Sequence, residues 1–159
     1  MNTVYLLLGS NVGNSKQHLH IAKQKITKYI GKIRRSSSIY ITAAWGKQDQ
    51  QDFLNQVIII DTNFSAIDTL SKSIAIEHEM GRIRTIKNAP RIIDIDILFF
   101  NKEIIKTPTL SVPHPLIQER KFVLTPLNEL SPNWKHPVFK VSVHQLLIKC
   151  IDKLSVDKI

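Results

Sequence analysis

Two aspartates, Asp94 and Asp96, lie two positions apart in the apolar stretch 90–100. β-Branched and aromatic residues dominate this stretch, and polar and apolar positions alternate at its start, which predicts a β-strand. Side chains two positions apart in a strand share a face, so the carboxylates lie roughly 6–7 Å apart and repel each other. Mg²⁺ prefers such oxygen ligands and usually binds substrate phosphates as well. The pair therefore indicates either a metal-phosphate site or a strand whose acids simply face water.

Arginines precede the acidic pair closely. Arg91 lies just before the strand, and Arg82 and Arg84 lie in the basic segment that leads to it. Guanidinium groups match the geometry of phosphate oxygens, so acids for a metal beside these arginines suit phosphoryl-type transfer. Leu98 and Phe100 continue the two-residue spacing of the aspartates. We therefore expect one face that turns from acidic to apolar, with the aspartates at the rim of a core-covering strand.

The composition is that of an ordinary globular protein. A chain of 159 residues with 43% hydrophobic content predicts one domain, residues 1–159. Its single cysteine, Cys150, excludes a disulfide within the chain, and the apolar run near the N-terminus is too short for a membrane span. We therefore expect a cytoplasmic protein with no membrane partner. The net charge of +9 favours an anionic partner, but the lysines are scattered as on solvated helix surfaces.

The elements that must position these residues alternate in type along the chain. We expect strands at about residues 3–8, 33–41, 53–62 and 90–100, with helices at about 16–29 and 65–80. The order βαββαβ is the ferredoxin-like pattern, an α+β fold with a mainly antiparallel sheet and both helices on one face. C-terminal additions follow: short strands near 104–112 and helices at about 122–130 and 141–154.

Four short motifs occur in one order along the chain. They are Leu8-Gly9-Ser10-Asn11; Gly46 to Gln50 with Phe53-Leu54-Asn55; Pro90-Arg91 with Ile93 to Leu98; and Val112 to Pro115 with Arg120, Phe122 and Leu124. Together they resemble the 6-hydroxymethyl-7,8-dihydropterin pyrophosphokinases of folate biosynthesis, over roughly residues 4–133. The resemblance implies transfer of a diphosphate from ATP to the pterin hydroxymethyl group, with release of AMP. It further implies two Mg²⁺ ions, a monomer and no nucleic-acid partner.

The resemblance assigns the phosphate chemistry to residues around the acidic pair. Asp94 and Asp96 match the metal ligands, and together with Arg82 and Arg91 they form the implied catalytic set. The implied ATP-binding set is Glu77, Arg82, Arg84, Arg91, Ile97, Ser111, His114 and Arg120. Attack at phosphorus needs charge neutralisation and in-line positioning more than covalent help, which these residue types can supply. The sequence assigns no general base.

A second group matches the pterin-binding positions of the family. The implied set is Ser10, Asn11, Thr42, Ala43, Trp45, Phe53, Asn55 and Phe122. A pterin edge carries several donors and acceptors, which loop backbone groups and the Asn55 amide can read, and Asn is otherwise depleted in strands. Phe53 and Phe122 would stack on the two faces of the ring, although core packing is the alternative for both.

Several positions depart from the family pattern. The loop Arg84 to Ala89 lacks the Trp-Gly that many relatives carry before Pro-Arg. Trp45 stands where some relatives have a smaller aliphatic residue, Phe53 replaces a common Tyr, and Pro115 stands where some have Tyr. We expect these changes to affect loop behaviour and affinity while leaving the type of reaction intact.

Two other functions remain open on the sequence alone. A ferredoxin-like sheet with a strongly basic chain is also typical of a non-catalytic RNA-binding module. The basic and aromatic pattern of such modules is missing from the central strands, and paired acids repel phosphates unless a metal is bound. A nucleotide-binding regulatory domain of the same fold is the third hypothesis, but it requires neither the acidic pair nor the pterin-type loop.

Overall fold

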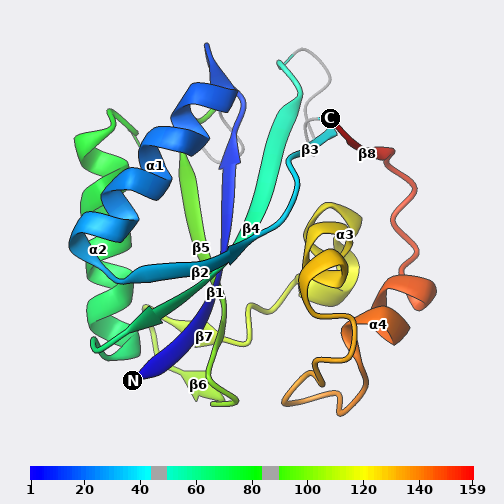
Figure 1. The fold of residues 1–159 in the computed structure, drawn as a ribbon. Coiled ribbons are helices and arrows are strands. Elements are labelled where there is room, and N and C mark those ends of the chain that lie inside the picture. Colours follow the sequence, from blue (N-terminus) through cyan, green and yellow to red (C-terminus); the bar gives the residue numbers. More distant parts are fainter. Residues whose placement is uncertain (44–49, 84–89) are drawn as a thin grey trace.

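The computed structural model describes residues 1–43, 50–83 and 90–159. In these ranges a six-stranded antiparallel sheet is flanked by helices on both faces (Figure 1). The sheet runs in the order β5 (Asp94–Phe100), β1 (Asn2–Ser10), β4 (Phe53–Thr62), β3 (Tyr40–Thr42) and β8 (Val156–Lys158), and β2 (Lys32–Ser36) also pairs with β4. A small hairpin of β6 (Ile105–Lys106) and β7 (Ser111–Val112) stands apart from it.

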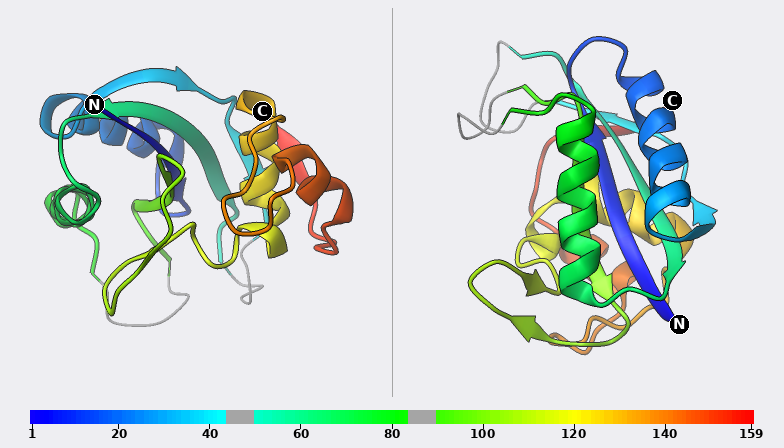
Figure 2. Two further views of the ribbon diagram at one scale, coloured as in Figure 1. Left: turned by 90° about the horizontal axis from the view of Figure 1, so that it is seen from below. Right: turned by 90° about the vertical axis from the view of Figure 1, so that its left-hand side faces the viewer.

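The helices form one layer on each side of the sheet. Helices α1 (Ser15–Tyr29) and α2 (Ala66–Glu79) lie side by side on one face, as Figure 2 shows. Helix α3 (Lys121–Leu130) covers the other face, with α4 (Val143–Lys149) packed beside it and a 3₁₀ turn (Ile117–Glu119) before it. The antiparallel sheet with both early helices on one face agrees with the expected α+β architecture.

The helix boundaries follow from local capping chemistry. The Asn14 side chain accepts the Gln17 N–H at 3.1 Å to begin α1, and the Ser65 hydroxyl accepts the Asp68 N–H at 3.2 Å to begin α2. After α2, Gly81 adopts a φ of +96°, which glycine alone adopts without strain. These caps confirm the boundaries expected from the sequence.

The strands divide their side chains between two apolar clusters. In β1, Val4, Leu6 and Leu8 pack against α1 and α2, whereas Tyr5 and Leu7 pack against α3 and α4. This strict alternation along a central strand buries both faces. The result is a rigid sheet, and the functional pocket described below lies at one end of it.

The second expected strand, residues 33–41, is broken into β2 and β3. The interruption lies at Ser37, whose hydroxyl accepts the Val57 N–H at 3.0 Å and whose carbonyl accepts the Gln56 side-chain amide at 2.7 Å. Glu129 of α3 takes the Ser38 N–H at 3.0 Å. Hydrogen bonds that involve the side chains of Ser37, Gln56 and Glu129 thus replace the regular ladder here. This corrects the prediction of one continuous strand.

The apolar end of β5 also differs from the prediction. Leu98 shares the face of Asp94 and Asp96, but Phe100 packs with the α1–α2 cluster on the opposite face. The pairing register explains this, because Leu6 pairs with Ile97 whereas its neighbour Tyr5 pairs with Phe99, which leaves Leu98 as the extra residue of a β-bulge. The bulge reverses the alternation, so the predicted shared face ends at Leu98.

The last expected helix is shorter than predicted. It spans Val143–Lys149 instead of reaching residue 154, and Cys150 is already extended with φ −67° and ψ 130°. The following residues turn and form β8, an outer strand that the periodicity did not reveal. Of the helices in the described ranges, none combines the length and apolar character that crossing a membrane requires.

Candidate active site

A pocket opens where the C-terminal ends of β1 and β3 meet the N-terminal ends of β4 and β5. It encloses about 660 Å³ of empty space, part of it open to solvent. Its lining residues are Leu7, Gly9, Thr42, Ala43, Phe53, Asn55, Arg91, Asp94, Asp96, Arg120 and Phe122. The structure thus brings residues of the predicted catalytic, ATP-binding and pterin-binding sets into one cavity.

Asp94 is held between two guanidinium groups at the pocket wall. Its Oδ1 accepts from Nη1 of Arg82 at 2.6 Å, and its Oδ2 accepts from Nη1 of Arg91 at 3.0 Å. The Arg82 side chain is only 10% exposed, so this pair experiences little screening by water. The predicted catalytic arginines and the first aspartate therefore form one charged cluster.

Asp96 lies two residues further along the strand, opposite Leu7 of β1. Its pKa is raised to about 7, mainly by burial and also by the charges of Asp94 and Glu77, while Arg120 and Arg91 act in the opposite direction. A carboxyl with so raised a pKa lies where additional positive charge is favourable. This electrostatic environment fits a hard cation bound through carboxylate oxygens.

The acidic pair supplies two protein ligands to such an ion. In the ranges that the structure describes, no three His, Cys, Asp or Glu side chains are grouped closely enough to hold a metal. Mg²⁺ commonly binds through one or two carboxylates and takes its other ligands from water and substrate phosphates. The two aspartates therefore fit a metal that arrives with a polyphosphate substrate.

Glu77 of α2 lies behind the acidic pair and is 1% exposed. Its Oε2 accepts the Ile95 N–H at 2.7 Å and Nη1 of Arg82 at 3.0 Å. The described contacts thus place this carboxylate as a support for the strand and the arginine. Its predicted contact with ATP stays a prediction.

The predicted pterin residues occupy the other half of the pocket. Phe53, Asn55 and Phe122 line it, together with Thr42 and Ala43 at the end of β3. The Thr42 hydroxyl donates to the Ser155 carbonyl at 2.9 Å, and Thr42 pairs with Phe53 and Val156 in the ladders on its two sides. An amide and backbone groups between two aromatic side chains match the expected means of reading a flat polar ring.

Gly9 allows Asn55 to approach β1 closely. A Cβ at position 9 would lie 2.8 Å from the Asn55 Oδ1, too close for any side chain. Gly9 and Leu7 both line the pocket, although the sequence analysis did not assign them to the site. The signal for Gly9 was its place in the turn motif, while nothing in the sequence distinguishes Leu7 from other core residues.

Ser10 and Asn11 are buried beside the pocket. The Asn11 Oδ1 accepts the Arg91 N–H at 2.7 Å, and its own N–H donates to the Arg91 carbonyl at 3.0 Å. Its side-chain amide also donates to the Gln50 side chain at 3.0 Å and to the Gln51 carbonyl at 3.2 Å. Asn11 therefore joins the turn after β1 to the entry of β5, and Gln50 and Gln51 are supports that the sequence did not reveal.

The remaining predicted ATP residues are spread over the edge of β5. His114 and Ser111 line a separate cavity beside β6 and β7, and Ile97 packs in the α1–α2 cluster. Burial, with Arg120 nearby, lowers the His114 pKa to about 4, while Asp94 acts in the opposite sense. Because the Leu116 N–H donates to its Nδ1 at 3.2 Å, the neutral ring carries its proton on Nε2.

Arg120 precedes α3 and lines the main pocket. Burial lowers its pKa, whereas the carboxylates of Asp96 and Asp94 raise it. Its guanidinium also lies 5.6 Å from the centre of the Phe122 ring, which orients both side chains. Two further predicted residues, Trp45 and Arg84, lie outside the described residues.

Solved structures share this fold. The crystal structure of Plasmodium falciparum HPPK-DHPS A437G matches with a TM-score of 0.78 at 20% identity, over 93% of this chain and 45% of that chain. A second HPPK-DHPS crystal structure, in complex with substrates, matches with a TM-score of 0.72 at 18% identity, over 92% of this chain and 43% of that chain. These matches show that the chain has the fold of the HPPK-DHPS structures over most of its length.

The sequence itself specifies the family. The model of the 7,8-dihydro-6-hydroxymethylpterin-pyrophosphokinase (HPPK) family matches residues 5–132, and the chain belongs to this family. The 2-amino-4-hydroxy-6-hydroxymethyldihydropteridine pyrophosphokinase of Aquifex aeolicus is 41% identical over 140 residues, which are 88% of this chain and 87% of that protein. The Bacillus subtilis protein of the same name is 41% identical over 130 residues, 81% of this chain and 78% of that protein.

Some relatives are much longer. The folic acid synthesis protein FOL1 of Dictyostelium discoideum is 37% identical over 145 residues, which are 91% of this chain but 22% of that protein. The identification from motifs is confirmed, and this chain is a pyrophosphokinase of folate biosynthesis.

Proposed function

We propose that the chain transfers a diphosphate from ATP to the hydroxymethyl group of 6-hydroxymethyl-7,8-dihydropterin. The hydroxyl oxygen forms a bond to the β-phosphorus, the bond from that phosphorus to the α–β bridging oxygen breaks, AMP leaves, and the hydroxyl proton passes to solvent. The observation that carries the proposal is that Asp94, Asp96 and Arg91 share one pocket with Phe53 and Phe122.

The charged half of the pocket suits the polyphosphate of ATP. Arg91 and Arg120 line it, and Arg82 reaches it through Asp94. Guanidinium groups at these positions bind phosphate oxygens and stabilise the charge that develops on them during transfer. The backbone N–H of His114 donates to the Leu98 carbonyl at 3.0 Å, which holds the residue beside the same strand, and its neutral ring would add the Nε2–H as a donor. These residues would orient ATP for in-line attack.

We propose that Asp94 and Asp96 hold Mg²⁺, two ions in the full complex. When bound, the metal neutralises phosphate charge and strengthens the polarisation of the phosphorus. The raised pKa of Asp96 supports this, since it marks a desolvated carboxyl near other acids. Asp94 would exchange its two arginine partners for the ion, which frees Arg82 and Arg91 for phosphate.

The apolar half of the pocket suits the pterin ring. Phe53 and Phe122 supply aromatic surface, and Asn55, with backbone groups at Thr42 and Ala43, supplies the hydrogen bonds. Stacking between aromatic side chains gives affinity, whereas the amide gives selectivity for a ring with alternating donors and acceptors. Because both halves belong to one cavity, the pterin hydroxyl can approach the phosphates.

Two structural assignments belong to the same proposal. The order β5-β1-β4 with β2 and β3 outside β4, and α1 and α2 together on one face, supports a ferredoxin-like core. Residues 1–159 would act as one catalytic domain, since the apolar clusters on the two faces share the strands β1, β4 and β5.

One assay tests the function. Purified protein is mixed with Mg²⁺, ATP and the hydroxymethyl-dihydropterin, and nucleotide products are separated by chromatography. We expect AMP that forms only when the pterin is present. Formation of ADP instead of AMP, or no turnover by folded protein, would sink the proposal.

A further inference from the structure

The two walls of the pocket belong to different parts of the chain. Thr42 and Ala43 at the end of β3 form one wall, and Arg120 and Phe122 at the start of α3 form the other. The residues that follow α4 run past both walls before they form β8, which lies beside β3 above α3 in Figure 1. We name residues 152–158 the β8 segment.

Asp152 joins the β8 segment to the α3 wall. Its Oδ2 accepts the backbone N–H of Lys121, the first residue of α3, at 3.1 Å, and its Oδ1 accepts the Leu154 N–H at 3.0 Å. Within the described residues, the N-cap residue Arg120 makes no side-chain cap of its own. A carboxylate from 31 positions away therefore supplies the cap and the negative charge that a helix N-terminus favours.

The next residues of the β8 segment join it to the β3 wall. The Ser155 carbonyl accepts the Thr42 hydroxyl at 2.9 Å, and Val156 pairs with Thr42 in the antiparallel ladder. Without these contacts β3, three residues long, would be the exposed edge of the sheet. One short segment thus fixes both the helix end that carries Phe122 and the strand end that carries Ala43.

We propose that the β8 segment sets the position of the two pocket walls and thereby determines affinity for the pterin. The inference rests on the proposed function, and it concerns residues beyond the range 5–132 that the family model matches. Asp152 and Ser155 are positioning residues, since they reach the ligand only through α3 and β3. The acids on β5 lie at the opposite edge of the sheet from the segment, whereas Arg120 shares the α3 wall with Phe122.

The experiment measures KM separately for the two substrates. For Asp152→Ala we expect the pterin KM to rise about five-fold, the size of a lost helix cap. The ATP KM should rise less than the pterin KM, because Arg120 is the only proposed phosphate-binding residue in a wall that the segment contacts among the described residues. The kcat at saturating substrates should stay within about two-fold of wild type, a split that a general loss of folded protein does not produce. Asp152→Asn, which retains one acceptor oxygen, should show a smaller rise and covers the case in which the alanine variant fails to fold.

The matched control is Asp157→Ala, which removes an acidic side chain of the same segment that accepts from the Ser155 hydroxyl, while the backbone pairing of the segment with β3 and the bond from Thr42 to the Ser155 carbonyl stay in place. It should leave both KM values unchanged. Amide exchange without substrates gives a second readout: Asp152→Ala should speed exchange at Lys121 and Thr42, while Asp157→Ala should not. An active wild type with an unchanged pterin KM in both Asp152 variants overturns this inference alone. A folded wild type that makes no AMP overturns the proposed function and this inference with it.

Discussion

The carboxylate of Glu77 accepts the backbone N–H of Ile95 at 2.7 Å across the outer edge of β5. Ile95 lies between Asp94 and Asp96, so this one bond fixes the part of the strand that carries both acids. The same carboxylate oxygen receives Arg82 at 3.0 Å. Helix α2 therefore determines where the acidic pair stands, although its own residues do not line the main pocket.

Replacing Glu77 should impair both stability and turnover. Glu77→Ala leaves the buried Ile95 N–H without its acceptor, so we expect the free energy of unfolding to fall by about 1–3 kcal/mol. Glu77→Gln restores an acceptor but not the charge beside Arg82, so its kcat should fall about ten-fold with a smaller loss of stability. Urea denaturation and AMP formation measure the two effects. Glu79→Ala, at the surface of the same helix, is the control. A Glu77→Ala protein with the stability and turnover of wild type would contradict the assigned support role.

Asp96→Asn should separate catalysis from stability. The folded pKa of Asp96 is raised to about 7, above its unfolded value near 3.9, so its contribution to stability is present at low pH and lost as pH rises from about 4 through 7. The neutral variant should therefore be more stable than wild type at pH 8 without metal. Its turnover should fall about 10²–10³-fold, the usual loss when a group that stabilises transferring charge is removed.

Thermal unfolding across pH and AMP formation at saturating substrates test both parts of this prediction. Asp61→Asn, an acid on the surface of β4 paired with Arg34 at 3.4 Å, is the matched control. Retained activity in Asp96→Asn would exclude a role for this carboxylate in the chemistry.

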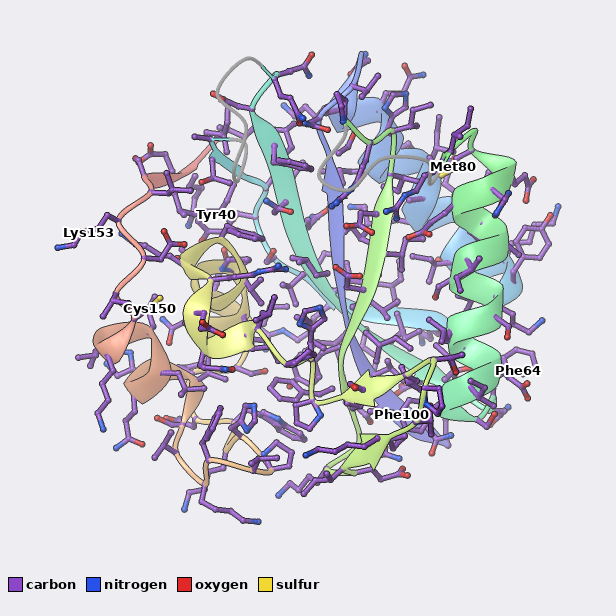
Figure 3. The ribbon with its side chains drawn as sticks, turned by 180° about the vertical axis from the view of Figure 1, so that it is seen from behind. Tyr40, Phe64, Met80, Phe100, Cys150 and Lys153 are labelled. Carbon is purple, nitrogen blue, oxygen red and sulfur yellow. The ribbon has the colours of Figure 1, made fainter. Side chains whose placement is uncertain are left out.

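The Tyr40–Glu129 pair should give stability that disappears in acid. The Tyr40 hydroxyl donates to Glu129 at 2.6 Å, joining β3 to α3, and Figure 3 shows Tyr40 beside this helix. Burial alone raises the pKa of Glu129, but the hydrogen bonds from Tyr40 and Ser38 outweigh it and lower the pKa. An acid whose pKa is lowered on folding stabilises the fold at pH values above its unfolded pKa. This stabilisation is lost as the pH falls through the folded pKa.

Tyr40→Phe should therefore lower the melting temperature at pH 7 and have progressively less effect as the pH falls below about 4. Melting curves of wild type and variant at matched pH values test this. Tyr29→Phe, a half-exposed tyrosine at the end of α1, serves as the control. An effect of Tyr40→Phe that does not change with pH would show that the hydroxyl acts without the carboxylate.

His114 should contribute a pH dependence of the same sign from a different cause. Its folded pKa is about 4, mainly through burial, against about 6.5 when unfolded, so the unfolded chain binds the extra proton between these values. Stability from His114 is fully present above pH 6.5 and is lost as pH falls toward 4. His114→Gln should flatten this part of the profile by about 3 kcal/mol, while the exposed His20→Gln should not. Identical slopes in His114→Gln and wild type would refute the assignment.

The sequence predicted the alternating elements and most of the pocket, because those features depend on local patterns. The strand periodicity placed Asp94 and Asp96 on one face, and the helical periodicity placed the first two helices close to their observed bounds. Leu98 shows where such reasoning fails, since a bulge depends on the pairing with β1 and leaves no local signal.

The supports of the site were also missed for a physical reason. Asp152 caps a helix 31 positions away, and Asn11 bonds residues that lie 80 positions further on. These side chains form their hydrogen bonds only after the fold has brought distant segments together. A polar loop residue that forms such a bond cannot be told in the sequence from one that does not. Predictions from local patterns therefore recover the residues that line the pocket better than the residues that hold them in place.

The bulge at Leu98 divides β5 into two parts that pair with β1 in registers one residue apart. The carbonyl of Leu98 accepts the His114 N–H at 3.0 Å, so the extra residue is also the attachment point of the segment before α3. Deleting Leu98 would restore a regular ladder with β1 and leave Asp94 and Asp96 opposite Gly9 and Leu7 as before. Such a shortened strand would keep its acids and release His114. The length of β5 therefore sets where the segment before α3 attaches, separately from the position of the acidic pair.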